Sequence, residues 1–300
     1  MKPRFRGIFI PTLTTFDDDG EVDFDVLGEM LEFNIKAGVH GLFVLGSTGM
    51  GPAMTTEQRL ATAEFVMERV RGRLPVIMHA GAADVQTTCR LAQHSQGLGV
   101  DAVAVVPPYY YTDHTSWEIT AHYKAVAAAV NGTPLFLYDN VKYSGWAFTP
   151  PTAKALQQEV PSLCGMKASY YAQGPLMGYL EAMPEDFAVM SGNSIDLLPA
   201  TPHGLSGAIP PLTSAIPEVC VALWDALERK DYEQAIPLQK KADDFGRTIG
   251  RLGQRFGRSA HREAMRARGF RIKRYPRWPS EELTEEAMRT VADALKATGV

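Results

Sequence analysis

The sequence predicts an α/β fold, a (β/α)8 TIM barrel with a C-terminal helical extension. Eight short apolar runs recur about every 20 to 35 residues, and helix-like segments separate most of them. Eight such units close naturally into a barrel of parallel strands. Residues 210–300 remain after the eighth run, which is more chain than one closing helix needs. The alternative architecture is an open, doubly wound sheet.

The strand candidates share a short apolar centre, and most begin or end at glycine or proline. They lie at residues 7–12, 41–46, 75–80, 102–108, 134–138, 163–167, 187–191 and 205–209. In such a barrel the active site lies at the carboxyl ends of the strands. The residues that follow each run are therefore the candidates for function.

Helix signals fall between these runs. Thr55 and Gln58 form a predicted capping box for a helix that stops before Gly72. Residues 118–130 predict another helix, and Pro150 opens a third in its first turn.

The C-terminal part also has the pattern of helices. Helices are predicted at 216–229, 232–251, 258–268 and 281–296, with an irregular connector at 275–279. We expect residues 1–215 to form the barrel core. Residues 216–300 then supply the closing helix and a helical extension packed on the barrel.

Composition excludes several classes of protein. The chain has 300 residues, 45% of them apolar and 21% charged, and a net charge of -4, which describes a globular protein with no signature of nucleic-acid binding. A basic stretch from Arg251 to Arg277 is interpreted as a solvated helix face and its following loop. No run is long and apolar enough for a signal peptide or a membrane span.

The three cysteines are widely separated. Cys89, Cys164 and Cys220 have no metal-binding spacing. We therefore expect a reduced, cytoplasmic protein without disulfides or a metal site.

Lys167 closes the apolar run at 163–167 and is the candidate nucleophile. Burial disfavours the ammonium form, so it lowers a lysine pKa and leaves more free amine to attack a carbonyl and form a Schiff base. The alternative is a surface lysine at a strand end, because buried lysines are rare.

A turn of small residues, Gly46-Ser47-Thr48-Gly49, follows the second run. Successive backbone N–H groups in such a turn can bind an anion, so a substrate carboxylate is a candidate ligand. An ordinary glycine turn is the alternative, and the glycine spacing does not match a dinucleotide-binding motif.

Tyrosines follow the fourth and fifth runs. Tyr109, Tyr110 and Tyr111 are consecutive, so they cannot all face a core, and at least one is exposed or reaches a site or a subunit contact. Tyr138 ends the fifth run, where its phenol could exchange protons. Ordinary aromatic packing is the alternative for each tyrosine. Ser191-Gly192 follows the seventh run and supplies polar groups and close backbone approach.

Together these stretches resemble the dihydrodipicolinate synthase and N-acetylneuraminate lyase family of Schiff-base-forming barrel enzymes. The resemblance covers residues 7–285. It rests on the turn at 46–49, the tyrosines at 109–110, Leu137-Tyr138, Gly165-Met166-Lys167, Ser191-Gly192 and the run at 204–209.

The resemblance implies roles for these residues. Lys167 forms a Schiff base with pyruvate or a similar 2-oxo acid, and Tyr138 moves protons, oriented by Ser47 and by Tyr110. The second strand-four tyrosine of this family crosses into a neighbouring subunit's site, which implies a homo-oligomer, a dimer of dimers. No metal or organic cofactor is needed. The substrate-binding set it implies is Gly46, Ser47, Thr48, Gly49, Tyr143, Ser169, Ser191, Gly192 and Ile209.

Two departures bear on the substrate. Met50 replaces a glutamate that often follows the turn, and Tyr143 aligns with the arginine that binds the second substrate's carboxylate in the synthase. Without that guanidinium, uncharged aldehydes are expected to be preferred over aspartate semialdehyde. Residues 42–52, the three tyrosines and the stretch from Tyr275 look most like 2-keto-3-deoxy sugar acid aldolases.

The expected function is thus a class I lyase or aldolase that makes or breaks a carbon–carbon bond of a 2-keto-3-deoxy acid, with pyruvate and an aldehyde as partners. A related Schiff-base dehydratase, hydratase-aldolase or synthase-like enzyme is the alternative. A non-catalytic sugar-acid sensor is the third reading. Retention of Lys167 and Tyr138 argues against the sensor.

Overall fold

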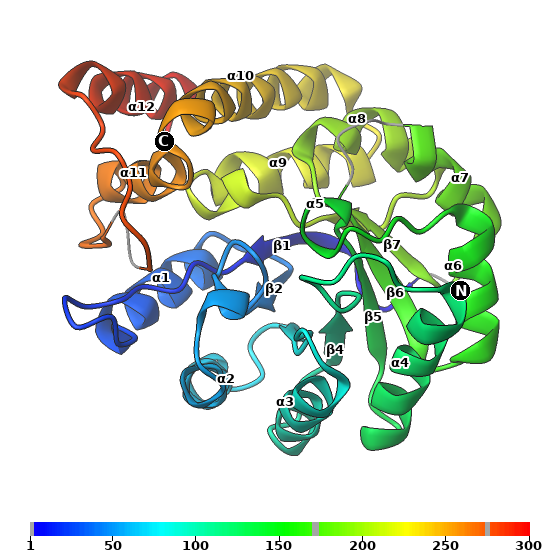
Figure 1. Ribbon diagram of the computed structural model, residues 1–300. Coiled ribbons are helices and arrows are strands. Elements are labelled where there is room, and N and C mark those ends of the chain that lie inside the picture. Colours follow the sequence, from blue (N-terminus) through cyan, green and yellow to red (C-terminus); the bar gives the residue numbers. More distant parts are fainter. Residues whose placement is uncertain (1–2, 170–173, 274–276) are drawn as a thin grey trace.

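The computed structural model describes residues 3–169, 174–273 and 277–300. Its eight strands form a closed barrel in sequence order, and every neighbouring pair is parallel (Figure 1). The strands are β1 (Gly7–Pro11), β2 (Gly41–Val44), β3 (Val76–His79), β4 (Ala102–Val105), β5 (Leu135–Asp139), β6 (Leu163–Ala168), β7 (Ala188–Ser191) and β8 (Gly207–Ala208). All eight predicted runs are strands, so the predicted (β/α)8 fold is confirmed.

Helices surround the barrel, as Figure 1 shows. The longer ones between strands are α1 (Phe24–Lys36), α2 (Thr56–Val70), α3 (Val85–Gly97), α4 (Ser116–Ala129), α6 (Pro150–Glu159) and α7 (Gly174–Ala182). The predicted capping box of Thr55 and Gln58 is present at α2, and Arg71 ends that helix in the left-handed conformation. Local sequence therefore sets the boundaries of these helices.

Four short elements follow the carboxyl ends of strands and shape the mouth of the barrel. They are η1 (Gly51–Ala53), α5 (Val141–Ser144), η2 (Ser194–Asp196) and η4 (Pro211–Ser214). Two more, α8 (Leu197–Ala200) and η3 (Thr201–His203), connect η2 to β8.

The barrel interior is filled by large side chains from alternate strand positions. Phe9, Phe43, Phe136, Met190 and Tyr138 belong to one buried cluster inside the barrel. Because side chains alternate across a strand, residues at even positions of β5 and β7 face inward. Tyr138 is the last inward residue of β5, at the mouth.

Four α-helices follow β8 in the described residues, as predicted. They are α9 (Pro217–Glu228), α10 (Tyr232–Phe256), α11 (Ser259–Ala267) and α12 (Glu285–Thr298). Helix α10 packs against α9, α11 and α12. No helix in the described part of the chain combines the length and apolarity that a membrane crossing requires.

The interpretation of the basic stretch 251–277 as a solvated face is wrong in part. Arg251 and Arg255 are exposed, but Arg262 is only 1% exposed and Arg258 is half-buried. Arg262 lies in α11, most of whose residues are buried, and Arg258 immediately precedes that helix. The predicted connector at 275–279 is irregular where it is described, at 277–279; Tyr275 and Pro276 lie outside the described residues.

Candidate active site

Lys167 lies inside the mouth of the barrel, near the end of β6. It is 4% exposed, and its Nζ lies 4.6 Å from the ring centre of Phe43 and 4.8 Å from that of Tyr138. Tyr138 is its register partner on β5. The prediction that this lysine is buried is confirmed.

The surroundings of Lys167 lower the pKa of its amine. Burial lowers its pKa, and the neighbouring Tyr138 opposes that effect without cancelling it. A lysine amine with a lowered pKa is a nucleophile for carbonyl carbon.

The Tyr138 phenol is held by two hydrogen bonds. Its oxygen lies 3.2 Å from Ser47 Oγ and accepts a bond of 2.8 Å from Asn140 Nδ2. Burial raises the pKa of Tyr138, but the Lys167 ammonium and the bonds from Ser47 and Asn140 outweigh burial, so the pKa lies below its ordinary value. A lowered pKa makes the phenol a better group for proton transfer.

The turn after β2 is fixed by its backbone. Leu45 and Met50 flank it with left-handed φ angles of 61° and 59°. A Cβ on Gly51 would lie 1.9 Å from the Leu45 carbonyl oxygen, so only glycine fits there. Among the described residues, the backbone N–H groups of Ser47 and Thr48 have no hydrogen-bond acceptor. They are available to an anion at the mouth.

A cavity of about 640 Å³ opens above Lys167. Seven predicted site residues line it: Ser47, Thr48, Tyr138, Tyr143, Lys167, Ser169 and Gly192. A smaller cavity of about 240 Å³ shares Ser47, Tyr143 and Arg258 with it, and also contacts His79 and Tyr109. The fold thus brings most of the predicted set together.

The structure places the other predicted residues outside both cavities. Ser191 is at an outward position of β7, and its hydroxyl bonds to Asp196 and to the backbone N–H of Asn193. Ile209 is buried in the barrel interior. Gly46 and Gly49 shape the turn without lining a cavity. These positions give no support to substrate contact by Ser191 or Ile209.

Tyr110 is 82% exposed and contacts Tyr111, and neither lines a cavity. Tyr109 is half-buried, so the three tyrosines do not share one environment, as predicted. Within this chain it is Asn140 that supports the Tyr138 phenol beside Ser47. The orienting role of Tyr110 stays a prediction that concerns a neighbouring subunit.

Sequence reasoning missed three groups at the mouth. Asn140 is expected from the sequence only as a possible pocket-lining residue, and its hydrogen bond to the Tyr138 phenol was missed, although the two-residue period of a strand end places it near Tyr138. His79 is buried and neutral, because burial and Arg59 lower its pKa to about 3, and its Nδ1 bonds to the Leu45 carbonyl. Arg258 donates to the Ser47 carbonyl oxygen at 2.6 Å and to the Tyr143 hydroxyl at 2.8 Å.

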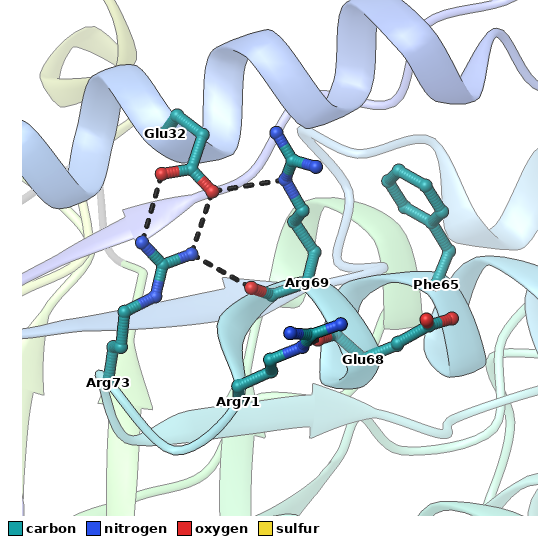
Figure 2. Close-up of a pocket in the computed structure, with 6 residues that line it drawn as sticks. All are labelled: Glu32, Phe65, Glu68, Arg69, Arg71 and Arg73. Carbon is teal, nitrogen blue, oxygen red and sulfur yellow. Dashed lines mark hydrogen bonds and ion pairs between the residues drawn. The ribbon is translucent and has the colours of Figure 1, made fainter.

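A different hollow, of about 450 Å³, lies between α1 and α2 at the opposite end of the barrel (Figure 2). Glu32 there accepts bonds from both terminal nitrogens of Arg73 and from Arg69. The Arg73 hydrogen bonds lower the pKa of Glu32 to about 2. The Glu32 carboxylate and the guanidinium groups of Arg69 and Arg73 pair with one another at the surface. The hollow therefore has the features of a stabilising ion-pair network.

Among the described residues, no group of three or more His, Cys, Asp or Glu side chains is arranged to hold a metal ion. The three cysteines are free thiols.

The family model for dihydrodipicolinate synthetase matches residues 4–298. The chain belongs to the dihydrodipicolinate synthetase family. The 4-hydroxy-tetrahydrodipicolinate synthase of Maridesulfovibrio salexigens is 30% identical over 245 residues, 82% of this chain and 83% of that protein. The probable 2-dehydro-3-deoxy-D-pentonate aldolase YjhH of Escherichia coli K12 is 30% identical over 305 residues, 99% of this chain and 98% of its own.

A solved structure supports the same membership. YagE, a prophage protein of the dihydrodipicolinic acid synthase family from E. coli K12, was crystallised in complex with pyruvate; it superposes with a TM-score of 0.92 at 26% identity, covering 99% of each chain. The expected family and enzyme class are thus confirmed: the chain is a carbon–carbon lyase of the Schiff-base-forming, class I aldolase type.

Proposed function

We propose that Lys167 forms a Schiff base with pyruvate, and that the protein cleaves or forms a carbon–carbon bond of a 2-keto-3-deoxy acid. The observation that carries this proposal is the buried Lys167 amine beside the Tyr138 phenol, inside a cavity with room for a substrate. The similarity to the aldolase YjhH over nearly the whole of both chains supports the aldolase outcome.

The reaction begins with attack of the neutral Lys167 amine on the keto carbon. A carbon–nitrogen bond forms, the keto oxygen takes a proton, and loss of water gives an imine that is protonated on nitrogen. In the cleavage direction, removal of the proton from the substrate's C4 hydroxyl breaks the C3–C4 bond. The aldehyde leaves, and the electron pair moves into the imine to give an enamine, which is protonated and hydrolysed to pyruvate.

Tyr138 is the group placed to move the proton. Its lowered pKa gives a phenolate fraction that accepts the hydroxyl proton, and Ser47 and Asn140 hold its oxygen in place. The free N–H groups of Ser47 and Thr48 would bind the 2-oxo acid carboxylate. The same residues suit the dehydratase, hydratase-aldolase and synthase-like alternatives, because the imine serves each of them.

We propose a homo-oligomer, a dimer of dimers, in which Tyr110 reaches a neighbouring subunit. Tyr110, Tyr111 and Trp117 are 82%, 68% and 77% exposed on adjacent segments, which is unusual for aromatic side chains. Tyr110 also has a left-handed φ of 84°, a conformation that costs energy in an aromatic residue and turns the side chain outward.

Two further points of the sequence analysis remain proposals. A cytoplasmic location rests on the composition and the unpaired cysteines. The division into a barrel core at 1–215 and a closing helix with extension at 216–300 rests on the helix pattern after β8.

The proposal is tested by incubating the protein with a panel of 2-keto-3-deoxy acids and measuring pyruvate release with lactate dehydrogenase. Release by the native protein and none by a Lys167→Met variant is expected. Loss of water without pyruvate release identifies the dehydratase alternative instead. No reaction with any acid of the panel, in either direction, contradicts the proposal.

A further inference from the structure

The larger cavity carries more positive charge than a single 2-oxo acid needs. Four cationic side chains line it: Lys142, Lys167, Arg258 and Arg262. No aspartate or glutamate among the described residues is part of its lining. Lys142, Arg258 and Arg262 carry three of these charges apart from the Lys167 nucleophile, and the carboxylate of pyruvate neutralises one of them at most. At least two positive charges of the lining are not neutralised by pyruvate.

Neither guanidinium has a carboxylate partner. Arg262 bonds to the backbone oxygens of Thr14 and Lys273 and to the Met50 sulfur, and Arg258 bonds to the Ser47 carbonyl and the Tyr143 hydroxyl. No acidic side chain in the described part of the chain lies within ion-pair distance of either. The Met50 thioether is only a weak hydrogen-bond acceptor and carries no charge, so it does not neutralise Arg262.

An unpaired buried guanidinium group is unfavourable, and that of Arg262 remains charged. Burial, and then Arg258, lowers the pKa of Arg262 to about 9, which is still above neutral pH. A guanidinium has five N–H donors, and the bonds to protein atoms leave some donors of both side chains unused. A bound anion would relieve the repulsion between the two arginines and fill these donors.

The cavity also has room for a longer substrate. The glycines at positions 246, 250, 253 and 257 of α10 and its end line it, and a Cβ at Gly250, Gly253 or Gly257 would meet no atom within 4 Å. Arg258 sits at the wall shared with the smaller cavity, beside Tyr143. A guanidinium group therefore lies beside Tyr143, although it comes from a residue 115 positions later in the chain.

We propose that the substrate end remote from the keto group is anionic, a carboxylate or a phosphate, and that Arg258 and Arg262 bind it. The acceptor in the condensation direction is then an aldehyde with an acid group. This inference rests on the proposed function, because the aldehyde is defined by the Schiff-base reaction. It reverses the preference for uncharged aldehydes that Tyr143 alone predicted.

The test compares pairs of aldehydes that differ mainly in charge, each condensed with pyruvate. Glyceraldehyde 3-phosphate is paired with glyceraldehyde, and succinic semialdehyde with butanal. A kcat/KM at least about tenfold higher for a charged member is expected, and the pair with the larger ratio identifies phosphate or carboxylate. Equal values, or a preference for the neutral member of both pairs, overturn the inference.

Variants of Arg258 test whether this residue causes the preference for charged aldehydes. Arg258→Met is expected to lower the charged-to-neutral ratio by about tenfold, and Arg258→Lys by less, because lysine keeps the charge without the planar fork. Arg255→Met is the matched control, since Arg255 is exposed, pairs with Glu281 and lines neither cavity. If Arg258→Met lowers both members of a pair equally, Arg258 only holds the Ser47 turn and the inference fails.

Failure of this inference is distinguishable from failure of the proposed function. If the protein forms a Schiff base with pyruvate but shows no preference for charged aldehydes, only the inferred anion site is refuted. Absence of the Schiff base removes the proposed function itself.

Discussion

Tyr138 and Lys167 are register partners in the parallel pair of β5 and β6, and the Lys167 Nζ lies 4.8 Å from the centre of the Tyr138 ring. Both side chains point into the barrel at its mouth, where burial acts on both. Each group acts on the pKa of the other: Lys167 lowers the pKa of Tyr138, and Tyr138 raises that of Lys167. This pairing follows from the barrel register.

Removing the Tyr138 hydroxyl separates imine formation from proton transfer. A Tyr138→Phe variant keeps the ring against Phe43 and Lys167 and is expected to lower turnover about 100-fold, the scale of a lost general acid-base group. Reduction of the pyruvate adduct by borohydride should remain possible. Tyr123→Phe is the control, because the buried Tyr123 hydroxyl bonds only to the Val105 carbonyl in this structure. Native turnover in Tyr138→Phe would reassign Tyr138 to packing.

Asn140 is expected to tune the phenol. Its Nδ2 donates to the Tyr138 oxygen at 2.8 Å, which stabilises the phenolate, so Asn140→Leu should raise the pKa of Tyr138. The measurement is a difference titration of phenolate absorbance between each protein and its Tyr138→Phe counterpart. An unchanged midpoint in the Asn140→Leu background would show that this hydrogen bond does not act on the phenol.

The strands and part of the candidate site could be predicted from the sequence. The strands were predictable because each is a short apolar run between turn residues, and Lys167, Tyr138 and Ser47 were predictable because each follows or ends such a run. Ser191 was predicted on the same grounds, yet it holds an outward position of β7 and bonds to Asp196. Whether a residue at a strand end can reach the cavity depends on the face of the strand that its side chain occupies.

Arg258 could not be predicted, for a different reason. It meets Ser47 across 211 positions of sequence, from a stretch whose composition looks like a solvated helix face. Only the packing of α10 and α11 over the barrel mouth brings the two together. Contacts of this kind depend on tertiary structure, and no local pattern encodes them.

The buried lysine should cost stability. In the folded state its pKa is lowered, so the unfolded chain binds more protons between the two pKa values and stability rises with pH through that window. Lys167→Met has no charge to bury and is expected to be more stable by about 0.5 to 2 kcal/mol near neutral pH, the usual gain when a strained functional group is replaced.

That gain should shrink as the pH rises toward the ordinary lysine pKa of about 10.4, where the lysine of the unfolded chain also loses its proton and folding no longer has to remove it. Denaturant unfolding of both proteins across this range checks the sign. A variant that is less stable than the native chain at neutral pH would show that the amine contributes packing or hydrogen bonds that outweigh its desolvation.

The exposed aromatic residues test the assembly. Tyr110→Asp places a charge in the proposed interface and is expected to shift the protein to smaller species in sedimentation velocity and to lower turnover. Tyr232→Asp is the control, since Tyr232 is also exposed but lies at the start of α10. Equal sedimentation of native protein and Tyr110→Asp, at every concentration tested, would remove Tyr110 from the interface.

The central claim is that Lys167 carries the substrate covalently. The protein is incubated with pyruvate, reduced with borohydride, digested and mapped by mass spectrometry, with the exposed neighbour Lys142 as an internal comparison. The reduced pyruvate adduct is expected on the peptide that contains Lys167, and it should be absent from Lys167→Met. An adduct on another lysine, or none with pyruvate and a broad panel of 2-oxo acids, would contradict the account.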